Sequence, residues 1–273
     1  MNNCVVLIPH HKYDLIYLEK LSLNRIYDVF DNMQCYLILP SYINANKFID
    51  INLDKNVKDK YLLYHDNFDY MYFDDKWFNS AAANNSLMLT KNIYIPFKEL
   101  GFDYMLIAQL DAFVFHNDID NYLNKNYDFI GSYLFTCLDS WYIDKIIEEY
   151  PNHYLTHQII LNGGFSLRNI DFCILTIEYY TPWLQDTVIK EGLDNNYILI
   201  GEDDFFSQNV KNIAEPLDIF RFAISGNNIV KCHFLINYEY PMAIHAILDE
   251  EKNKYAQFLI NNFLKENNIS YII

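Results

Sequence analysis

Two short apolar runs, each closed by a proline, constrain the fold of this chain more than any other feature. The first covers residues 5–8 and ends at Pro9, and the second covers residues 35–39 and ends at Pro40. Such runs of valine, leucine and isoleucine are typical of buried strands. Between them, apolar side chains recur at helical spacing over residues 14–31. A strand, a helix and a strand with short connections predict the start of a parallel α/β sheet.

A third run, residues 104–110, gives the strongest strand pattern and leads directly into Asp111. Ligands bind at the carboxyl ends of strands in open α/β sheets, so we expect Asp111 at a binding site. An ionised carboxylate in a buried place is costly unless a cation or hydrogen bonds stabilise it. A hard divalent ion that bridges to phosphate oxygens would do so. The alternative is that Asp111 caps the turn after the strand.

Three further clusters carry candidate chemistry. The Asn-Gly-Gly sequence at residues 162–164 allows a close approach that a Cβ would block, or else forms a bulge or tight turn. The acidic residues 202–204 suit the start of a helix, or they supply a general base for an acceptor hydroxyl. His245, alone in an apolar stretch, is typical of a core residue. It becomes a candidate metal ligand only if the fold brings it to Asp111.

Missing motifs and the overall charge exclude several classes of protein. The chain has no Gly-x-Gly-x-x-Gly, no P-loop lysine motif, no Cys/His zinc spacing and no Gly-x-Ser-x-Gly. Redox chemistry with dinucleotides, P-loop phosphoryl transfer, zinc sites and serine hydrolases are therefore disfavoured. With 20 Lys+Arg against 36 Asp+Glu in 273 residues, the net charge is −16, which argues against broad nucleic-acid binding.

The location of the protein is also predicted from composition. Five cysteines without a Cys-x-x-Cys spacing predict buried free thiols in a reducing compartment, that is, the cytoplasm. No window of 18 uninterrupted apolar residues and no basic signal segment occur, so we expect no membrane span. Peripheral contact with a membrane and the oligomeric state are left open.

The order of these clusters resembles the bacterial glycosyltransferase-like proteins of the DUF5672 family, which are GT-A-like. The resemblance extends over residues 4–247 and is most specific at residues 109–115, Gln-Leu-Asp-Ala-Phe-Val-Phe, and 162–168, Asn-Gly-Gly-Phe-Ser-Leu-Arg. Further matching stretches are residues 5–9, 21–23, 85–89, 127–131, 202–207 and 245–246.

The resemblance implies a GT-A-like, Rossmann-type α/β fold with a mostly parallel sheet flanked by helices. It implies one domain over residues 1–273, in which about 1–125 bind a nucleotide sugar and about 126–273 bind the acceptor. The donor would be a UDP-hexose in the commonest case, held through Mn²⁺ or Mg²⁺. The acceptor would be a glycan, a lipid-linked glycan or a protein, as in polysaccharide biosynthesis. Residues 132–157 would border the acceptor.

The resemblance also implies roles for single residues. Asp111 would be the main metal ligand, at the last position of a DxD-type motif whose first position is Gln109, and His245 would complete the metal site. Asp203, with Glu202 next to it, would supply the catalytic base. The residues implied in binding the donor are Pro9, His10, Asn85, Gln109, Asn162, Gly163 and Gly164.

Together, the residues and the resemblance predict a metal-assisted hexosyltransferase. Asp203 would accept the proton of the acceptor hydroxyl as that oxygen attacks the anomeric carbon, which inverts the configuration. A retaining enzyme would use the same acids to bind the acceptor. Two alternatives are a metal-dependent hydrolase or nucleotidyltransferase with the same acids, and a non-catalytic nucleotide- or glycan-binding module in which Gln109 marks a decayed site.

Overall fold

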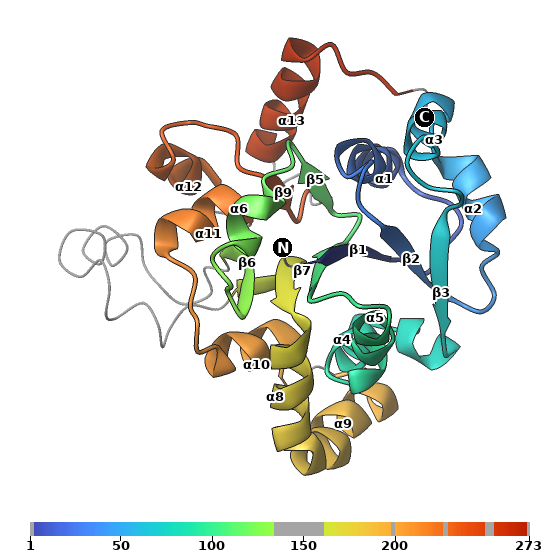
Figure 1. Ribbon diagram of the computed structural model, residues 1–273, viewed down its shortest axis with the longest axis vertical. Helices are drawn as coiled ribbons and strands as arrows, with labels where there is room; N and C mark the ends of the chain where they lie inside the picture. The colour runs from blue at the N-terminus through green and yellow to red at the C-terminus, as the bar shows by residue number, and fades with distance from the viewer. Residues whose placement is uncertain (1–2, 134–160, 198–199, 226–228, 249–253, 272–273) are drawn as a thin grey trace.

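One sheet runs through the computed structural model, which describes residues 3–133, 161–197, 200–225, 229–248 and 254–271 (Figure 1). Within these residues the sheet has nine strands in the order β3-β2-β1-β4-β7-β6-β8-β9-β5. Five of the eight strand pairings are parallel. The structure thus confirms the expected α/β fold with a mostly parallel sheet. The division into a donor half and an acceptor half stays a prediction.

The first part of the sheet is parallel throughout. Its strands are β1 (Cys4–Pro9), β2 (Cys35–Pro40), β3 (Asp69–Phe73) and β4 (Tyr104–Ala108). Every residue of β1, β2 and β4 is buried. Strands covered by helices on both faces are apolar along their whole length, which explains why the sequence predicted these three so clearly.

The second part of the sheet is mixed. Strand β7 (Leu161–Asn169) runs antiparallel to both of its neighbours, β4 and β6 (Phe129–Tyr133). Beyond β6 lies β8 (Ala223–Ser225), which is parallel to β6, and then β9 (Ala243–His245), which is parallel to β8. The last strand in this order, β5 (Ala112–Val114), pairs antiparallel with β9 and not with β4, although only three residues separate it from β4 in the chain.

Helices cover both faces of the sheet. Figure 1 shows α1 (Tyr17–Val29) and α13 (Lys254–Glu266) on one side, and α4 (Ala81–Met88), α5 (Ile95–Glu99) and α8 (Ile170–Trp183) on the other. The other helices are α2 (Ala45–Asn52), α3 (Lys55–Tyr61), η1 (Asp75–Phe78), η2 (Lys91–Ile93), α6 (Ile119–Leu123), the π-helix η4 (Leu184–Ile189), α9 (Lys190–Asp194), α10 (Glu202–Asn209), α11 (Pro216–Phe222) and α12 (Ile229–Leu235).

Apolar and helix-forming residues over 77–100, with Ala81, Ala82 and Ala83 at the centre, predict one long helical region that Pro96 ends or bends, and the structure corrects this prediction. Four short helices occupy the region, and Pro96 lies in the first turn of α5 instead of ending or bending a longer helix. The first turn tolerates proline because its N–H groups have no partner within the helix.

Two observations bear on the predicted thiols and on membranes. Cys4, Cys35 and Cys173 are buried and free, as expected, Cys232 is buried, and Cys137 lies outside the described residues. In the parts of the chain that the structure describes, no helix is both long and apolar enough to cross a membrane.

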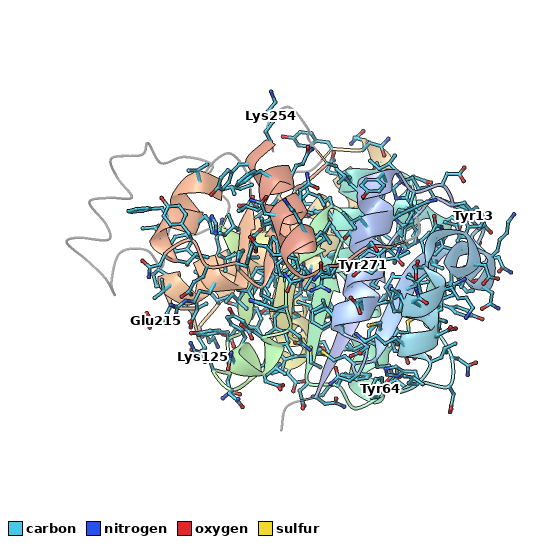
Figure 2. All side chains as sticks on the ribbon, turned by 90° about the horizontal axis from the view of Figure 1, so that it is seen from above. Tyr13, Tyr64, Lys125, Glu215, Lys254 and Tyr271 are labelled. Atoms are coloured by element: carbon cyan, nitrogen blue, oxygen red, sulfur yellow. The ribbon has the colours of Figure 1, made fainter. Side chains whose placement is uncertain are left out.

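The chain returns to its first helix near its end. The hydroxyl of Tyr271 donates to Asp28 on α1, 2.9 Å away, and Figure 2 shows Tyr271 in the middle of the view, beside that helix. Asp28 also pairs with Arg25 at 2.9 Å and with Lys60 at 2.7 Å. This contact ties residues after α13 to the parallel part of the sheet.

Candidate active site

The candidate site lies at the carboxyl ends of β1 and β4. The parallel register pairs Leu7 with Ile107, so Pro9 and His10 lie beside Gln109. On the other side of β4, the amide of Gln109 donates to the carbonyl of Gly164 at 2.8 Å. Antiparallel pairing of β4 with β7 thus brings the Asn-Gly-Gly sequence to the same edge as the end of β4.

Asp111 and His245 meet because β5 leaves β4 and pairs with β9. This pairing sets His245 opposite Ala112, and His245 Nε2 lies 3.1 Å from Asp111 Oδ1. Neither atom makes a hydrogen bond, although both are buried, so the angle between them does not suit one. Burial raises the pKa of Asp111, but the neighbouring His245 outweighs this and lowers it below its ordinary value.

The geometry of this pair fits a divalent cation. Two ligands at right angles on such an ion, each about 2.1 Å from it, lie about 3 Å apart. Asp111 and His245 have this spacing, and both facing atoms lack another partner. Among the described residues, no group of three or more His, Cys, Asp or Glu side chains is arranged to hold a metal. Oxygens of a bound substrate and water would have to complete the coordination.

A cleft of about 430 Å³ opens beside this pair. Its lining residues are Pro9, His10, His11, Glu19, Phe78, Asn79, Ser80, Ala81, Asn84, Gln109, Leu110, Asp111 and Leu248. They include two carboxylates but no lysine or arginine. Burial lowers the pKa of His10 to about 3 and also lowers that of His11, so both rings are neutral near pH 7. Lys12 pairs with Glu19, so an anionic ligand beside Asp111 would need its counter-charge from a bound cation.

The two glycines at residues 163 and 164 each face a different functional cluster. A Cβ on Gly164 would collide with His245 Nε2 and would lie 2.7 Å from Gln109 Oε1. A Cβ on Gly163 would collide with Glu202 and would lie 2.8 Å from Arg168 Nη2. The close approach expected at this sequence is therefore present. A shift of register opposite, between Gly131 and Ser132, shows that the strand pairing is also irregular here.

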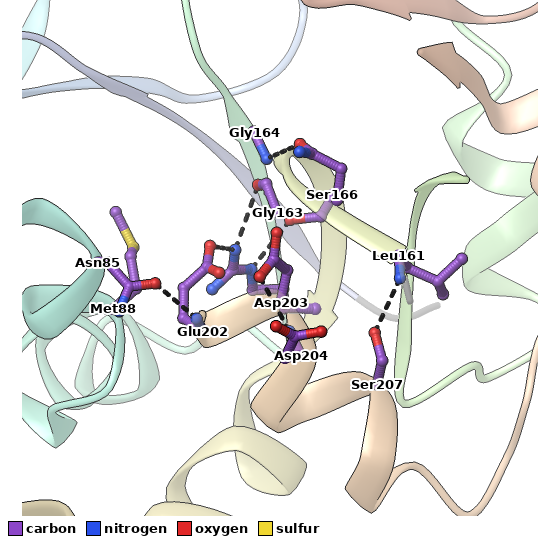
Figure 3. A network of polar contacts seen from close by, with 12 residues as sticks. Asn85, Met88, Leu161, Gly163, Gly164, Ser166, Glu202, Asp203, Asp204 and Ser207 are labelled. Carbon is purple, nitrogen blue, oxygen red and sulfur yellow. Dashed lines mark hydrogen bonds and ion pairs between the residues drawn. The ribbon is translucent and has the colours of Figure 1, made fainter. Parts of the chain in front are cut away.

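The acidic residues form the start of α10 (Figure 3). Glu202 is buried, its amide donates to Asn85 Oδ1, and its Oε1 lies 2.7 Å from Arg168 Nη2. Burial raises the pKa of Glu202, although the charge of Arg168 opposes the rise. Asp203 is half-buried and accepts a hydrogen bond from the amide of Asp204 at 2.9 Å. Burial, and then the charge of Asp203, raise the pKa of Asp204.

The structure divides the predicted site residues between the cleft, with the glycine turn and His245 beside it, and the start of α10. Pro9, His10, Gln109 and Asp111 line the cleft. Asn85 instead binds the backbone at the start of α10, through the amide of Glu202 and the carbonyl of Ile200. Residues 134–157 of the expected acceptor border lie outside the described residues.

Sequence reasoning missed two residues of this site. Glu19 lines the cleft, pairs with Lys12 at 2.8 Å and accepts from the amide of Ile16, and no local pattern marked it. Arg168 was part of a matching stretch but had no role. An arginine inside an apolar strand is rarely buried without a partner, and this pattern could have indicated it.

The family model DUF5672, described as a protein of unknown function, matches residues 67–245, about two thirds of the chain. The chain belongs to the DUF5672 family. No curated protein matches this DUF5672 chain in sequence.

Solved structures of glycosyltransferases resemble this DUF5672 protein in fold. The apo structure of the bifunctional glycosyltransferase WbbM has a TM-score of 0.54 and 10% identity, over 95% of this chain and 49% of WbbM. Galactosyltransferase LgtC, with donor and acceptor sugar analogues, has a TM-score of 0.49 and 9% identity, over 96% of this chain and 95% of LgtC. The mannosyltransferase Ktr4p from S. cerevisiae has a TM-score of 0.46 and 10% identity, over 77% of this chain and 66% of Ktr4p. The WbbM likeness shows that the fold is that of GT-A glycosyltransferases.

Proposed function

We propose that this DUF5672 protein is a glycosyltransferase that moves a hexose from a nucleotide sugar to a glycan-type acceptor, with Mn²⁺ or Mg²⁺ bound. The observation that carries the proposal is the Asp111–His245 pair in a cleft whose lining residues include no lysine or arginine, with Lys12 paired to the other lining carboxylate, Glu19. Lys12 offsets the charge of Glu19, but an anionic donor and Asp111 repel each other unless a cation lies between them. The GT-A fold supplies the class of reaction.

The donor would lie in the cleft with its diphosphate beside Asp111 and His245. A bound divalent ion offsets the charge that grows on the leaving diphosphate. The neutral ring of His10, which packs 5.4 Å from the ring of Phe48, offers a face and a nitrogen to the nucleobase. UDP is our first choice of nucleotide. Gln109, which replaces the first acid of the motif, would hydrogen-bond the ribose or a metal-bound water.

Asp203 is the better candidate for the base of the two neighbouring acids. Glu202 is buried against Arg168, whereas Asp203 is half-buried and has no ion pair among the described residues. Asp203 would accept the proton of the acceptor hydroxyl while that oxygen attacks the anomeric carbon. The configuration would then be inverted. In a retaining enzyme the same carboxylate would bind the acceptor instead.

A non-catalytic nucleotide- or glycan-binding module is the second candidate. Gln109 at the first position of the motif favours it, because a site with fewer acids holds its metal less firmly. Such a module binds a donor without turnover and is insensitive to Asp203→Asn. The acceptor, an acceptor-binding role for about residues 126–273, and a cytoplasmic location are parts of the proposal that rest on the sequence.

A panel of nucleotide sugars tests the proposal. Melting temperatures are measured with UDP-glucose, UDP-galactose and GDP-mannose, with and without Mn²⁺, for wild type and Asp111→Ala. We expect one donor to stabilise the wild type only with Mn²⁺, because a ligand that binds the folded state alone raises its stability. Release of nucleoside diphosphate from that donor should depend on Asp111.

Asp118→Ala is the matched control, since it removes an exposed carboxylate from the same part of the chain. It should keep the response to donor and Mn²⁺. Full turnover in Asp111→Ala would contradict the metal assignment. Donor binding without any turnover, in the presence of candidate glycan acceptors, would favour the binding module.

A further inference from the structure

Arg168 is the most completely engaged charged side chain near the site, and the proposed reaction gives it no role. Its exposed fraction is 0%. Nε donates to Ser166 Oγ at 3.0 Å and Nη1 to the hydroxyl of Tyr94 at 3.0 Å. Nη2 donates to the carbonyl of Gly163 at 3.2 Å and to Glu202 Oε1 at 2.7 Å. Four hydrogen bonds therefore use most of the five N–H groups of the guanidinium.

These partners come from three separate parts of the fold. Ser166 and Gly163 are on β7, Glu202 begins α10, and Tyr94 follows η2 and donates to the carbonyl of Met88 on α4. The rings of Phe129 and Phe206 flank the guanidinium, with centroids 5.3 and 5.6 Å from Cζ. Aromatic rings on a planar cation leave it little freedom to move.

A buried guanidinium needs an anion, and Glu202 is the carboxylate that pairs with it. The pair fixes the first residue of α10 and, with it, the place from which Asp203 projects. The same Nη2 holds the carbonyl of Gly163, which also accepts from Ser166 Oγ at 2.8 Å. Because Gly164 packs directly on His245 and Gln109, a fixed Gly163 also fixes the wall beside the metal pair.

We propose that Arg168 is a positioning residue that holds both halves of the site: Glu202 and α10 on one side, and the glycine turn against His245 on the other. It touches neither donor nor acceptor. Its effect on turnover rests on the proposed function, whereas its effect on cation binding does not. Arg168 acts on His245 only through Gly163 and Gly164, so the loss of about 10–100-fold that follows removal of a direct outer partner of a metal ligand is the upper limit of its effect.

The test compares wild type with Arg168→Lys, which keeps the charge but lacks the fork that reaches four partners at once. Mn²⁺ affinity is measured from the electron paramagnetic resonance signal of the free ion. We expect Arg168→Lys to weaken Mn²⁺ binding by about tenfold. Where a donor is turned over, kcat should fall by about 10–100-fold with a smaller change in KM.

Arg25→Lys is the matched control. Arg25 is also buried, donates to the carbonyls of Val114 and Phe115, and pairs with Asp28. Its replacement should lower the melting temperature as much as Arg168→Lys does, but should leave Mn²⁺ affinity and kcat unchanged. If Arg168→Lys also lowers only the melting temperature, Arg168 is merely structural and the inference is wrong.

Tyr94→Phe provides a milder variant if Arg168→Lys does not fold. It removes one hydroxyl that orients Nη1, and a loss of Mn²⁺ affinity of about threefold or more is expected. Tyr61→Phe, which removes a buried hydroxyl that accepts from the amide of Cys35, should leave Mn²⁺ affinity unchanged. Equal Mn²⁺ affinities in the two tyrosine variants would overturn the inference.

The two proposals can fail separately. A wild type that binds Mn²⁺ but turns over no donor contradicts the transferase, while the Mn²⁺ comparison still decides the role of Arg168. A wild type that turns over a donor, with Arg168→Lys equal to it in Mn²⁺ affinity and kcat, contradicts the role of Arg168 alone. A wild type that binds no Mn²⁺ contradicts the metal site and this inference together.

Discussion

Nε2 of His245 lies 3.1 Å from Oδ1 of Asp111, and neither atom has a hydrogen bond. The pairing of β5 with β9 produces this contact, because the chain leaves β4 after Ala108 and three residues later enters β5, whose first residue, Ala112, pairs with His245. Two facing atoms without hydrogen bonds are costly to bury unless a third partner joins them. A cation shared by both side chains would be that partner.

The first prediction concerns His245. His245→Ala should weaken Mn²⁺ binding by at least about tenfold, since loss of even an outer partner of a metal ligand has such an effect. His116→Ala is the control, because His116 also lies near a carboxylate, 3.6 Å from Asp118, but is more exposed. Electron paramagnetic resonance of free Mn²⁺ measures both. Equal affinities in the two variants would remove His245 from the metal site.

A second prediction concerns Gly164. Gly164→Ala should destabilise the fold by about 1–3 kcal/mol, as overpacking of a buried place does, because its Cβ would meet His245 and Gln109. It should also weaken Mn²⁺ binding, since His245 must move. Urea unfolding and Mn²⁺ titration check the two effects. If the free energy of unfolding and the Mn²⁺ affinity both equal those of the wild type, the glycine turn accommodates the added Cβ without displacing His245.

The sequence predicted those parts of this arrangement that are local. Strands β1, β2 and β4 were recognisable because they are buried on both faces. Asp111 was recognisable because an acid directly after a buried strand is costly without a partner. Helices α2 and α3 were not predicted, although Asn44 and Asp54 cap them as these residue types commonly do.

The rest of the site depends on pairings between distant segments. Whether His245 reaches Asp111 depends on β9 pairing with β5, and no local pattern carries that register. Asn85 was expected in the donor site, but α4 and α10 pack so that its amide binds the start of α10. The partners of Arg168 come from three segments, so the sequence showed a buried arginine without showing its role.

The third prediction concerns His10 and acid. Its pKa, lowered by burial to about 3, lies below the value of about 6.5 expected in the unfolded chain. Between these values the unfolded state binds the extra proton, so stability falls as the pH falls from 6.5 toward 3. At pH 5 the loss due to His10 is about 2 kcal/mol. His10→Phe should remove this part of the difference between urea unfolding at pH 7 and pH 5. An unchanged difference would mean that His10 is charged in the folded protein or titrates alike in both states.

The last prediction separates the two neighbouring acids at the start of α10. Asp203→Asn removes the proposed base but leaves the Arg168–Glu202 pair intact, so nucleoside diphosphate release should fall by about 10²–10⁴-fold with little change in stability. Glu202→Gln leaves a fully buried guanidinium without its counter-charge, so the free energy of unfolding should fall by about 3 kcal/mol. Its turnover, measured at a temperature where it is folded, should fall less than that of Asp203→Asn. The opposite order, a stable but inactive Glu202→Gln beside an active Asp203→Asn, would make Glu202 the base despite its ion pair.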